Sequence, residues 1–213
     1  MDITKIAVEV FNKHANLYQT KFMDVSLYAD SLNQFCNTIK QQDTTILELA
    51  CGPGNITKHL LSKRPDFKVL GTDLSPNMIA LAKVNNPTAK FEIMDCRDIV
   101  SLNEDYDAIM CGFILPYLSM TESAKLFNDC YSRLRNNGVI YLSTMEGNYS
   151  DSGFQKGSTG DEIYMHFYNA DDLSKLLIEN GFEIINLSRV KSIMTNGAEV
   201  VDLIIIAEKK NDL

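Results

Sequence analysis

The hydrophobic positions of the chain follow two alternating periods. Short apolar runs rich in β-branched residues alternate with longer stretches in which apolar residues recur at helical spacing. The short runs predict seven strands, at residues 44–49, 67–71, 89–94, 106–111, 139–143, 182–190 and 200–208. The longer stretches predict helices at residues 55–63, 76–84, 121–135 and 171–180. Strands that alternate with helices are typical of parallel βαβ units, so we expect an α/β fold.

Capping and turn residues sharpen several of these boundaries. Ser75 is a good helix cap, and Pro76 suits the first helical position because proline has no N–H to satisfy there. Gly138 is expected to supply a left-handed turn before the fifth strand. A turn at Asn196 and Gly197 joins the last two strands without a helix, which makes that pair antiparallel.

Two segments lie outside the alternation. Residues 1–43 have helical character, and residues 145–169 form an insert rich in Gly, Ser and aromatic residues. The insert is too short and polar to be a domain of its own, and it is either a solvated loop or a lining of the substrate pocket. We therefore expect one domain over residues 1–213, with residues 1–43 as a helical cover.

Composition and charge narrow the class of protein. The 213 residues are 45% hydrophobic and 23% charged, as in an ordinary globular protein, and the formal charge of -8 makes nucleic acid and anionic membranes poor partners. Five cysteines without CxxC spacing predict reduced thiols and a cytoplasmic protein. No run is apolar for long enough to cross a bilayer, and the N-terminus lacks a signal-peptide pattern. The three histidines show no metal-ligand spacing, so no metal is expected.

The stretch ILELACGPGNIT, residues 46–57, runs from the first strand into two glycines. Gly52 and Gly54 allow a tight turn, and the N–H groups at the following helix start favour a phosphate or a carboxylate. A P-loop is excluded because Lys58 lacks the preceding glycine of that motif, and Thr57 weakens the dinucleotide fingerprint by standing where a third small residue belongs. Asp73, about 20 residues downstream, still fits a dinucleotide site, so that alternative stays open at this point.

Further motifs resemble one family. ELACGPGN resembles the first motif of class I S-adenosylmethionine-dependent methyltransferases, and GTDLSPNMIALAK looks like their acidic second strand end. MDCRDI is similar to their adenine-binding segment, YDAIMCGFILPYL to their fourth-strand motif, and RLRNNGVIYLST to the approach to the fifth strand. The match covers residues 44–144 in register. It implies a Rossmann-like, doubly wound sheet of seven strands, mostly parallel with an antiparallel last strand, and S-adenosylmethionine as the cofactor.

The resemblance also implies a set of cofactor-binding residues. Asp73 is expected to accept both ribose hydroxyls. Asp95 is expected to accept the adenine amino group, while the N–H of Cys96 or Arg97 donates to a ring nitrogen. Glu48, a carboxylate in an apolar strand, is expected to brace the glycine loop through N–H bonds or to lie near the cofactor's ammonium. The full set is Tyr18, Glu48, Ala50, Gly52, Gly54, Asp73, Leu74, Met78, Asp95, Cys96, Arg97 and Cys111.

The acceptor is expected to be a small molecule, because the end of the fourth strand departs from the motif of nucleic-acid methyltransferases. Methyl transfer by in-line displacement needs no obligatory catalytic side chain, although His166 or Tyr117 could act as a base. The expected acceptor pocket comprises Tyr28, Phe113, Tyr117, Tyr149, His166 and Phe167. The alternatives are a cofactor-binding regulatory module without turnover and a nicotinamide-dependent oxidoreductase. A monomer or a homodimer is expected.

Overall fold

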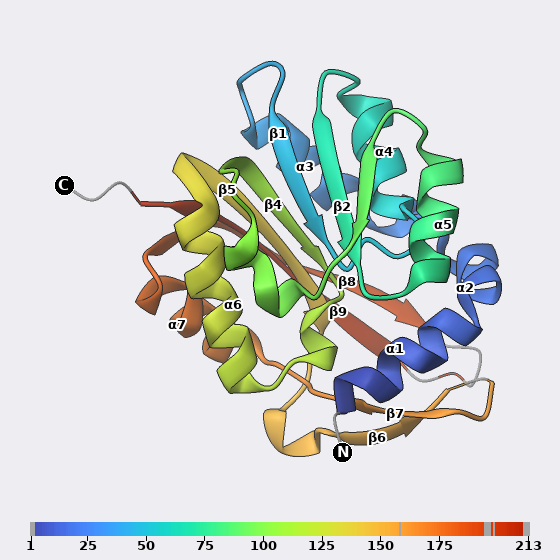
Figure 1. Ribbon diagram of the computed structural model, residues 1–213. Helices are drawn as coiled ribbons and strands as arrows, with labels where there is room; N and C mark the ends of the chain where they lie inside the picture. The colour runs from blue at the N-terminus through green and yellow to red at the C-terminus, as the bar shows by residue number, and fades with distance from the viewer. Residues whose placement is uncertain (1–2, 158, 194–196, 198, 211–213) are drawn as a thin grey trace.

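The computed structural model describes residues 3–157, 159–193, 197 and 199–210. Its central feature is a sheet of seven strands in the order β3-β2-β1-β4-β5-β9-β8 (Figure 1). The bounds are β1 (Thr45–Leu49), β2 (Lys68–Asp73), β3 (Lys90–Ile93), β4 (Tyr106–Gly112), β5 (Leu134–Met145), β8 (Phe182–Ile193) and β9 (Glu199–Lys209). β9 is antiparallel to both β5 and β8, while β1 to β5 pair in parallel. This confirms the expected mostly parallel, Rossmann-like sheet.

The strand order fixes where a ligand can bind. β1 pairs with β2 on one side and with β4 on the other, so the chain winds outward in both directions from the β1–β4 boundary. In a doubly wound sheet, ligands bind in the crevice outside the carboxyl ends of the strands at such a reversal. The glycine turn follows β1 directly and therefore lies at this point.

Helices cover both faces of the sheet because successive strand residues point to opposite sides. The bounds are α1 (Ile3–Lys13), α2 (Ala15–Phe22), α3 (Ala29–Thr38), α4 (Asn55–Lys63), α5 (Pro76–Asn85), α6 (Met120–Arg133) and α7 (Ala170–Glu179). Short 3₁₀ helices are η1 (Ser26–Tyr28), η2 (Cys96–Ser101), η3 (Leu115–Tyr117) and η4 (Tyr149–Asp151). No helix among these described residues is long and apolar enough to cross a membrane.

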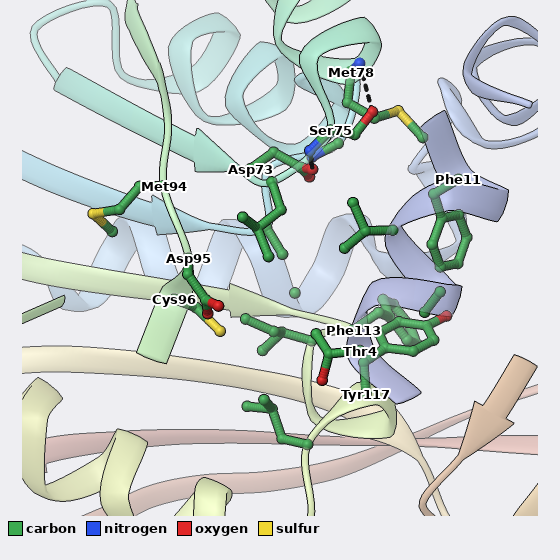
Figure 2. Close-up of a pocket in the computed structure, with 18 of the residues that line it drawn as sticks. Thr4, Phe11, Asp73, Ser75, Met78, Met94, Asp95, Cys96, Phe113 and Tyr117 are labelled. Carbon is green, nitrogen blue, oxygen red and sulfur yellow. Dashed lines mark hydrogen bonds between the residues drawn. The ribbon is translucent and has the colours of Figure 1, made fainter. Parts of the chain in front are cut away.

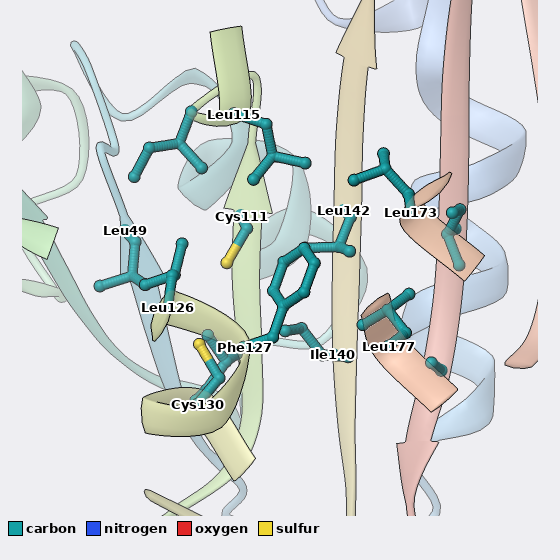
Figure 3. Packing of buried hydrophobic residues seen from close by; sticks show 14 of the residues in the cluster. Leu49, Cys111, Leu115, Leu126, Phe127, Cys130, Ile140, Leu142, Leu173 and Leu177 are labelled. Atoms are coloured by element: carbon teal, nitrogen blue, oxygen red, sulfur yellow. The ribbon is translucent and has the colours of Figure 1, made fainter. Parts of the chain in front are cut away.

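Two apolar clusters make up most of the core. On one face, Leu49 and Cys111 of the sheet pack with Phe127 and Cys130 of α6 and with Leu177 of α7 (Figure 3). On the other face, α3 and α4 pack on the sheet through residues that include Phe35 and Leu60. The helix α3 therefore belongs to a face of the sheet, although it lies within the stretch expected to be a cover.

The boundary between α6 and β5 differs from the prediction. We expected α6 to continue to residue 135 and Gly138 to take a left-handed turn, but β5 begins at Leu134 and the residue with positive φ is Asn137, at 59°. Gly138 serves a different need: a Cβ there would lie 2.8 Å from the Arg135 carbonyl oxygen. The glycine is thus required for close backbone approach, not for its φ.

The insert at residues 145–169 is not an irregular loop. It contains an antiparallel hairpin of β6 (Gly153–Lys156) and β7 (Glu162–Met165), in which Phe154 pairs with Tyr164. The hairpin lies beside α1, as Figure 1 shows. The turn expected at Asn196 and Gly197 falls partly outside the described residues; Gly197 itself has a positive φ of 83°.

Candidate ligand-binding site

A cavity lies at the carboxyl edge of the sheet, between the strand ends and α1 (Figure 2). Its wall combines the ends of β1, β2 and β4, the segment after β3, and the N-terminal helices. The lining residues are Thr4, Ala7, Val8, Phe11, Tyr18, Ala50, Gly52, Asp73, Leu74, Ser75, Met78, Met94, Asp95, Cys96, Gly112, Phe113, Ile114, Tyr117 and Leu118.

The glycine turn reaches this cavity through an unusual backbone. Ala50, Gly52 and Gly54 have positive φ angles of 51°, 53° and 76°. A left-handed residue other than glycine is uncommon, so Ala50 must be held there by its surroundings. Gly52 lines the cavity, and its N–H donates to the Asp73 carboxylate at 2.9 Å. The turn after β1 is thereby tied to the end of β2.

Asp73 holds this junction with both carboxylate oxygens. One accepts the Gly52 N–H, and the other accepts the Ser75 N–H at 2.8 Å. Each carboxylate oxygen has two acceptor positions, so Asp73 keeps capacity for further donors from the cavity. Burial raises the pKa of Asp73, while the two backbone hydrogen bonds oppose that effect. The arrangement can accept a pair of hydroxyl groups.

Asp95 and Cys96 form the next part of the wall, with Arg97 behind them. Asp95 accepts the Arg97 backbone N–H at 2.9 Å. It also accepts from the Arg97 guanidinium, whose Nε–H lies 3.0 Å from both carboxylate oxygens and whose terminal N–H lies 2.6 Å from one of them. Although burial acts in the opposite direction, these bonds lower the pKa of Asp95. The Arg97 N–H is therefore already engaged. Cys96 is the first residue of η2, whose N–H has no partner within its own helix and is the better donor for a ligand.

Glu48 does not line the cavity, and no hydrogen bond joins it to a glycine N–H within the described part of the chain. Its side chain is buried and accepts the Thr57 hydroxyl from the first turns of α4. Burial raises the pKa of Glu48 to about 8. We expected Glu48 to accept hydrogen bonds from the loop N–H groups. Instead, Glu48 accepts the Thr57 hydroxyl, and Asp73 accepts the N–H of Gly52 in the loop.

Gly54 and Cys111 also lie off the cavity wall. Gly54 begins α4 as its capping residue and accepts the Asn86 side-chain amide at 2.9 Å through its carbonyl oxygen. Cys111 is fully buried in the apolar cluster against α6. Both are placed where they shape the turn and the strand end without facing the cavity.

Aromatic side chains close the cavity on the side of α1. The Phe11 ring makes edge contacts with Tyr18 and Tyr117, at 5.8 and 5.2 Å between ring centroids. Figure 2 shows Phe11, Phe113 and Tyr117 together on the side of the cavity next to α1. Burial raises the pKa of both tyrosines, to about 12 for Tyr18, so both carry neutral hydroxyl groups.

The sequence analysis did not predict that residues of α1 line the cavity. Thr4, Ala7, Val8 and Phe11 follow the spacing i, i+3, i+4, i+7, which marks a single face of a helix. The spacing was visible, but it does not tell whether such a face packs on a sheet or over a cavity. Asn12 anchors this helix, because its side-chain oxygen accepts the Ser75 hydroxyl at 2.8 Å.

The residues expected around an acceptor divide into two groups. Phe113 and Tyr117 line the cavity, and Phe113 has a positive φ of 54° at the end of β4. Tyr28 lies one layer behind Phe113, at 5.3 Å between ring centroids, and donates its hydroxyl to Asp202 at 2.8 Å. The remaining three are on the side of the hairpin and do not line the cavity: Tyr149, His166 and Phe167.

His166 is buried between aromatic rings. Its ring stacks on Tyr149 at 5.6 Å and contacts Tyr164 at 4.9 Å. Neither ring nitrogen has a hydrogen-bond partner within the part of the chain that the structure describes. Burial lowers the pKa of His166, which keeps the ring neutral.

The arrangement defines a class of protein. A Rossmann-like sheet with a glycine turn after β1, and with acids at the end of β2 and after β3 at one cavity, is typical of α/β proteins that bind a nucleoside cofactor. Residues 46–138 match the family model described as a methyltransferase domain. The matched segment contains Gly52, Asp73 and Asp95, and in this part the chain is similar to methyltransferase domains.

Curated relatives match in part. A malonyl-[acyl-carrier protein] O-methyltransferase of Priestia megaterium is 30% identical over 138 residues, covering 63% of this chain and 49% of the relative. A trans-aconitate 2-methyltransferase of Variovorax paradoxus is 33% identical over 97 residues, covering 46% and 37%. The chain thus spans half or less of the length of these relatives.

The fold has close counterparts among solved structures. Magnesium protoporphyrin IX methyltransferase of Synechocystis, solved with bound S-adenosylmethionine, superposes with a TM-score of 0.73 at 15% identity. The superposition covers 99% of this chain and 98% of that one. The superposition therefore extends beyond the matched segment 46–138.

Proposed function

We propose that the chain binds S-adenosylmethionine in the cavity at the carboxyl edge and transfers its methyl group to a small-molecule acceptor. The observation that carries the proposal is the convergence of Gly52, Asp73 and the pair Asp95–Cys96 on one cavity. These residues come from the ends of three neighbouring strands, and all fall inside the segment matched by the methyltransferase family model.

The residues fit the cofactor part by part. Asp73 has acceptor capacity for the ribose hydroxyls after its two backbone hydrogen bonds are counted. The Cys96 N–H and the Asp95 carboxylate suit the adenine edge, with Leu74 and Met78 available to flank its faces. The turn at Gly52 is left for the methionine end.

When bound, the cofactor supplies a methyl group on a positively charged sulfur; the acceptor atom bonds to the methyl carbon as the carbon–sulfur bond breaks and its electron pair stays on sulfur. The chain's own contribution is to align the acceptor and exclude water. Phe11, Tyr18 and Tyr117 supply the apolar closure that such exclusion needs.

The two side chains considered as bases are poorly suited to that role. Burial raises the pKa of Tyr117, which opposes loss of its proton at neutral pH. His166 lies outside the cavity wall, and its ring is enclosed by Tyr149 and Tyr164. We therefore assign catalysis to orientation and desolvation, with no side chain as an obligatory base.

A small acceptor agrees with the relatives and with the charge. The relatives named above are methyltransferases of malonyl-[acyl-carrier protein] and of trans-aconitate. A formal charge of -8 opposes binding of a nucleic acid through its phosphates. The closed aromatic side of the cavity favours a compact acceptor over a polymer.

Calorimetric titration tests cofactor choice. We expect binding of S-adenosylmethionine and of its demethylated product, and no comparable binding of NADH. Tight NADH binding without a response to the other two would establish the oxidoreductase alternative instead. Incubation of the full chain with methyl-labelled cofactor and a metabolite extract then separates an enzyme, which transfers label, from a regulatory module, which binds the cofactor without turnover.

A further inference from the structure

Arg97 does not line the cavity, but it binds Asp95, which does. Its backbone N–H donates to Asp95 at 2.9 Å, its Nε–H lies 3.0 Å from both carboxylate oxygens, and its terminal N–H lies 2.6 Å from one of them. These N–H groups of one residue thus face a carboxylate that has room for roughly four hydrogen bonds. When the shared Nε–H is counted once, Asp95 keeps an acceptor position for a donor from the cavity.

Arg97 is itself fixed from the side of α6. Its second terminal nitrogen donates to Glu122 at 3.1 Å, and its carbonyl oxygen accepts the Lys125 ammonium at 3.1 Å. Glu122 is held in turn by the N–H and the hydroxyl of Ser119, at 2.8 and 2.7 Å. The guanidinium therefore has a defined place between two acids, and Asp95 cannot turn away from the cavity without losing the guanidinium hydrogen bonds.

The ion pair determines the charge of Asp95. Its side chain is 18% exposed, and burial raises its pKa, but the hydrogen bonds and the charge of Arg97 outweigh burial, so that the pKa is lowered. Within the described chain, the Cys96 thiol also faces Asp95, and Glu122 and Lys125 lie beyond Arg97. A ligand that covers Asp95 removes more of its water, and a buried carboxylate without its cation is costly.

We infer that Arg97 is a positioning residue that makes the cavity select a purine with an amino group at C6, because Arg97 keeps Asp95 ionised; this inference rests on the proposed function. An ionised carboxylate only accepts hydrogen bonds, so it suits an amino group and repels a carbonyl oxygen. A protonated acid can donate to a carbonyl oxygen and loses this distinction. Asp95 contacts the purine, whereas Arg97 acts through Asp95.

Two ligands that differ at C6 of the purine test the inference. S-adenosylhomocysteine carries the amino group, and S-inosylhomocysteine carries a carbonyl oxygen in its place. Hypoxanthine also has a hydrogen on N1, which weakens the proposed Cys96 contact in every variant alike. In calorimetry of the unmodified full chain, we expect a preference of about tenfold or more for S-adenosylhomocysteine, because repulsion replaces a hydrogen bond to a charged group. Equal binding of the two ligands overturns the inference and leaves the proposed function standing, whereas binding of neither overturns both.

Replacing Arg97 separates selection of the purine from a role in folding. Arg97→Gln removes the cation, so Asp95 takes up a proton when the ligand covers it, and we expect the preference to fall about tenfold. Arg97→Lys should retain part of the preference, because an ammonium keeps the charge without the paired geometry. Loss of a structural contact alone weakens the binding of both ligands in proportion. An unchanged preference in a folded Arg97→Gln protein therefore overturns the inference.

Arg189→Gln is the matched control. Arg189 donates to Glu146 through Nε–H and a terminal N–H, at 2.6 and 2.7 Å, in a comparable pair that lies off the cavity wall. Its substitution should leave the preference unchanged, and an equal fall in both variants would overturn the inference.

The pH dependence of the preference is a second measurement, and it also serves if Arg97→Gln does not fold. Between about pH 8 and about pH 5, the preference should fall with falling pH in Arg97→Gln, because a protonated Asp95 accepts the carbonyl ligand. It should stay constant in the unmodified chain. A preference that falls with pH in the unmodified chain shows that Asp95 gains a proton despite Arg97, which overturns the inference.

Discussion

Replacing Asp73 with alanine is the sharpest test of a single site residue. The substitution removes the acceptor of the Gly52 and Ser75 N–H groups and the proposed acceptor of two ribose hydroxyls. Hydrogen bonds to a charged group contribute about 1.5–3 kcal/mol each, but ribose exchanges them for hydrogen bonds to water. We therefore expect a net loss of about 1–3 kcal/mol in cofactor binding, or roughly 5- to 150-fold in Kd.

Calorimetry with S-adenosylhomocysteine measures this loss directly. Because the variant also frees two backbone N–H groups, urea unfolding must show that the protein remains folded under the conditions of the titration. Glu92→Ala is a matched control, since Glu92 is an exposed acid on β3 in register with Thr72, next to Asp73. An unchanged Kd in a folded Asp73→Ala protein would refute the ribose assignment.

Further substitutions test the loop, the buried acid and the cover. The Glu48 pKa of about 8 exceeds its ordinary value of 4.5, so the contribution of Glu48 to stability is present below about pH 4.5 and is lost as pH rises through about 8. In urea unfolding across that window, the free energy of unfolding should fall less with rising pH in Glu48→Gln than in the unmodified protein. Parallel curves for the two proteins would contradict this. Gly54→Ala should lower the free energy of unfolding by about 1 kcal/mol or more, because the φ of Gly54 is 76° and the new Cβ would lie 2.4 Å from the Asn86 amide. An unchanged urea midpoint would show that the added Cβ causes no strain. Asp161 accepts hydrogen bonds from Lys13 and from His14, at 3.0 and 2.7 Å, so Asp161→Asn should speed hydrogen exchange in β7 and at the end of α1; unaltered exchange would show that the contact does not hold the hairpin.

The sheet and its main helices could be predicted because their signals are local. Ser75 followed by Pro76 marks the start of α5, and the structure confirms both the start and the cap, in which the Ser75 hydroxyl accepts the Met78 N–H. The order of strands is not a local property; the resemblance of successive motifs supplied only the doubly wound, mostly parallel class of the sheet, and the order comes from the structure. The prediction of the boundary between α6 and β5 was wrong because a glycine such as Gly138 can serve either a left-handed turn or a close backbone approach. Only the packed structure shows that Gly138 serves the close approach to Arg135.

The candidate site was predictable where a residue follows a strand directly. Gly52 and Asp95 come after β1 and β3, Asp73 is the last residue of β2, and parallel strands bring their carboxyl ends to one edge. The partner of Glu48 was not predictable, because the Thr57 hydroxyl reaches it only after α4 packs against β1. The α1 face and the hairpin were also missed, since their position depends on contacts between distant parts of the chain.

A structure of the chain with S-adenosylhomocysteine tests the central claim most directly. The account predicts that the ligand occupies the cavity at the carboxyl edge, with its ribose hydroxyls on the Asp73 carboxylate and its adenine beside Asp95 and Cys96. A ligand bound elsewhere, or bound in this cavity with its ribose away from Asp73, would contradict it.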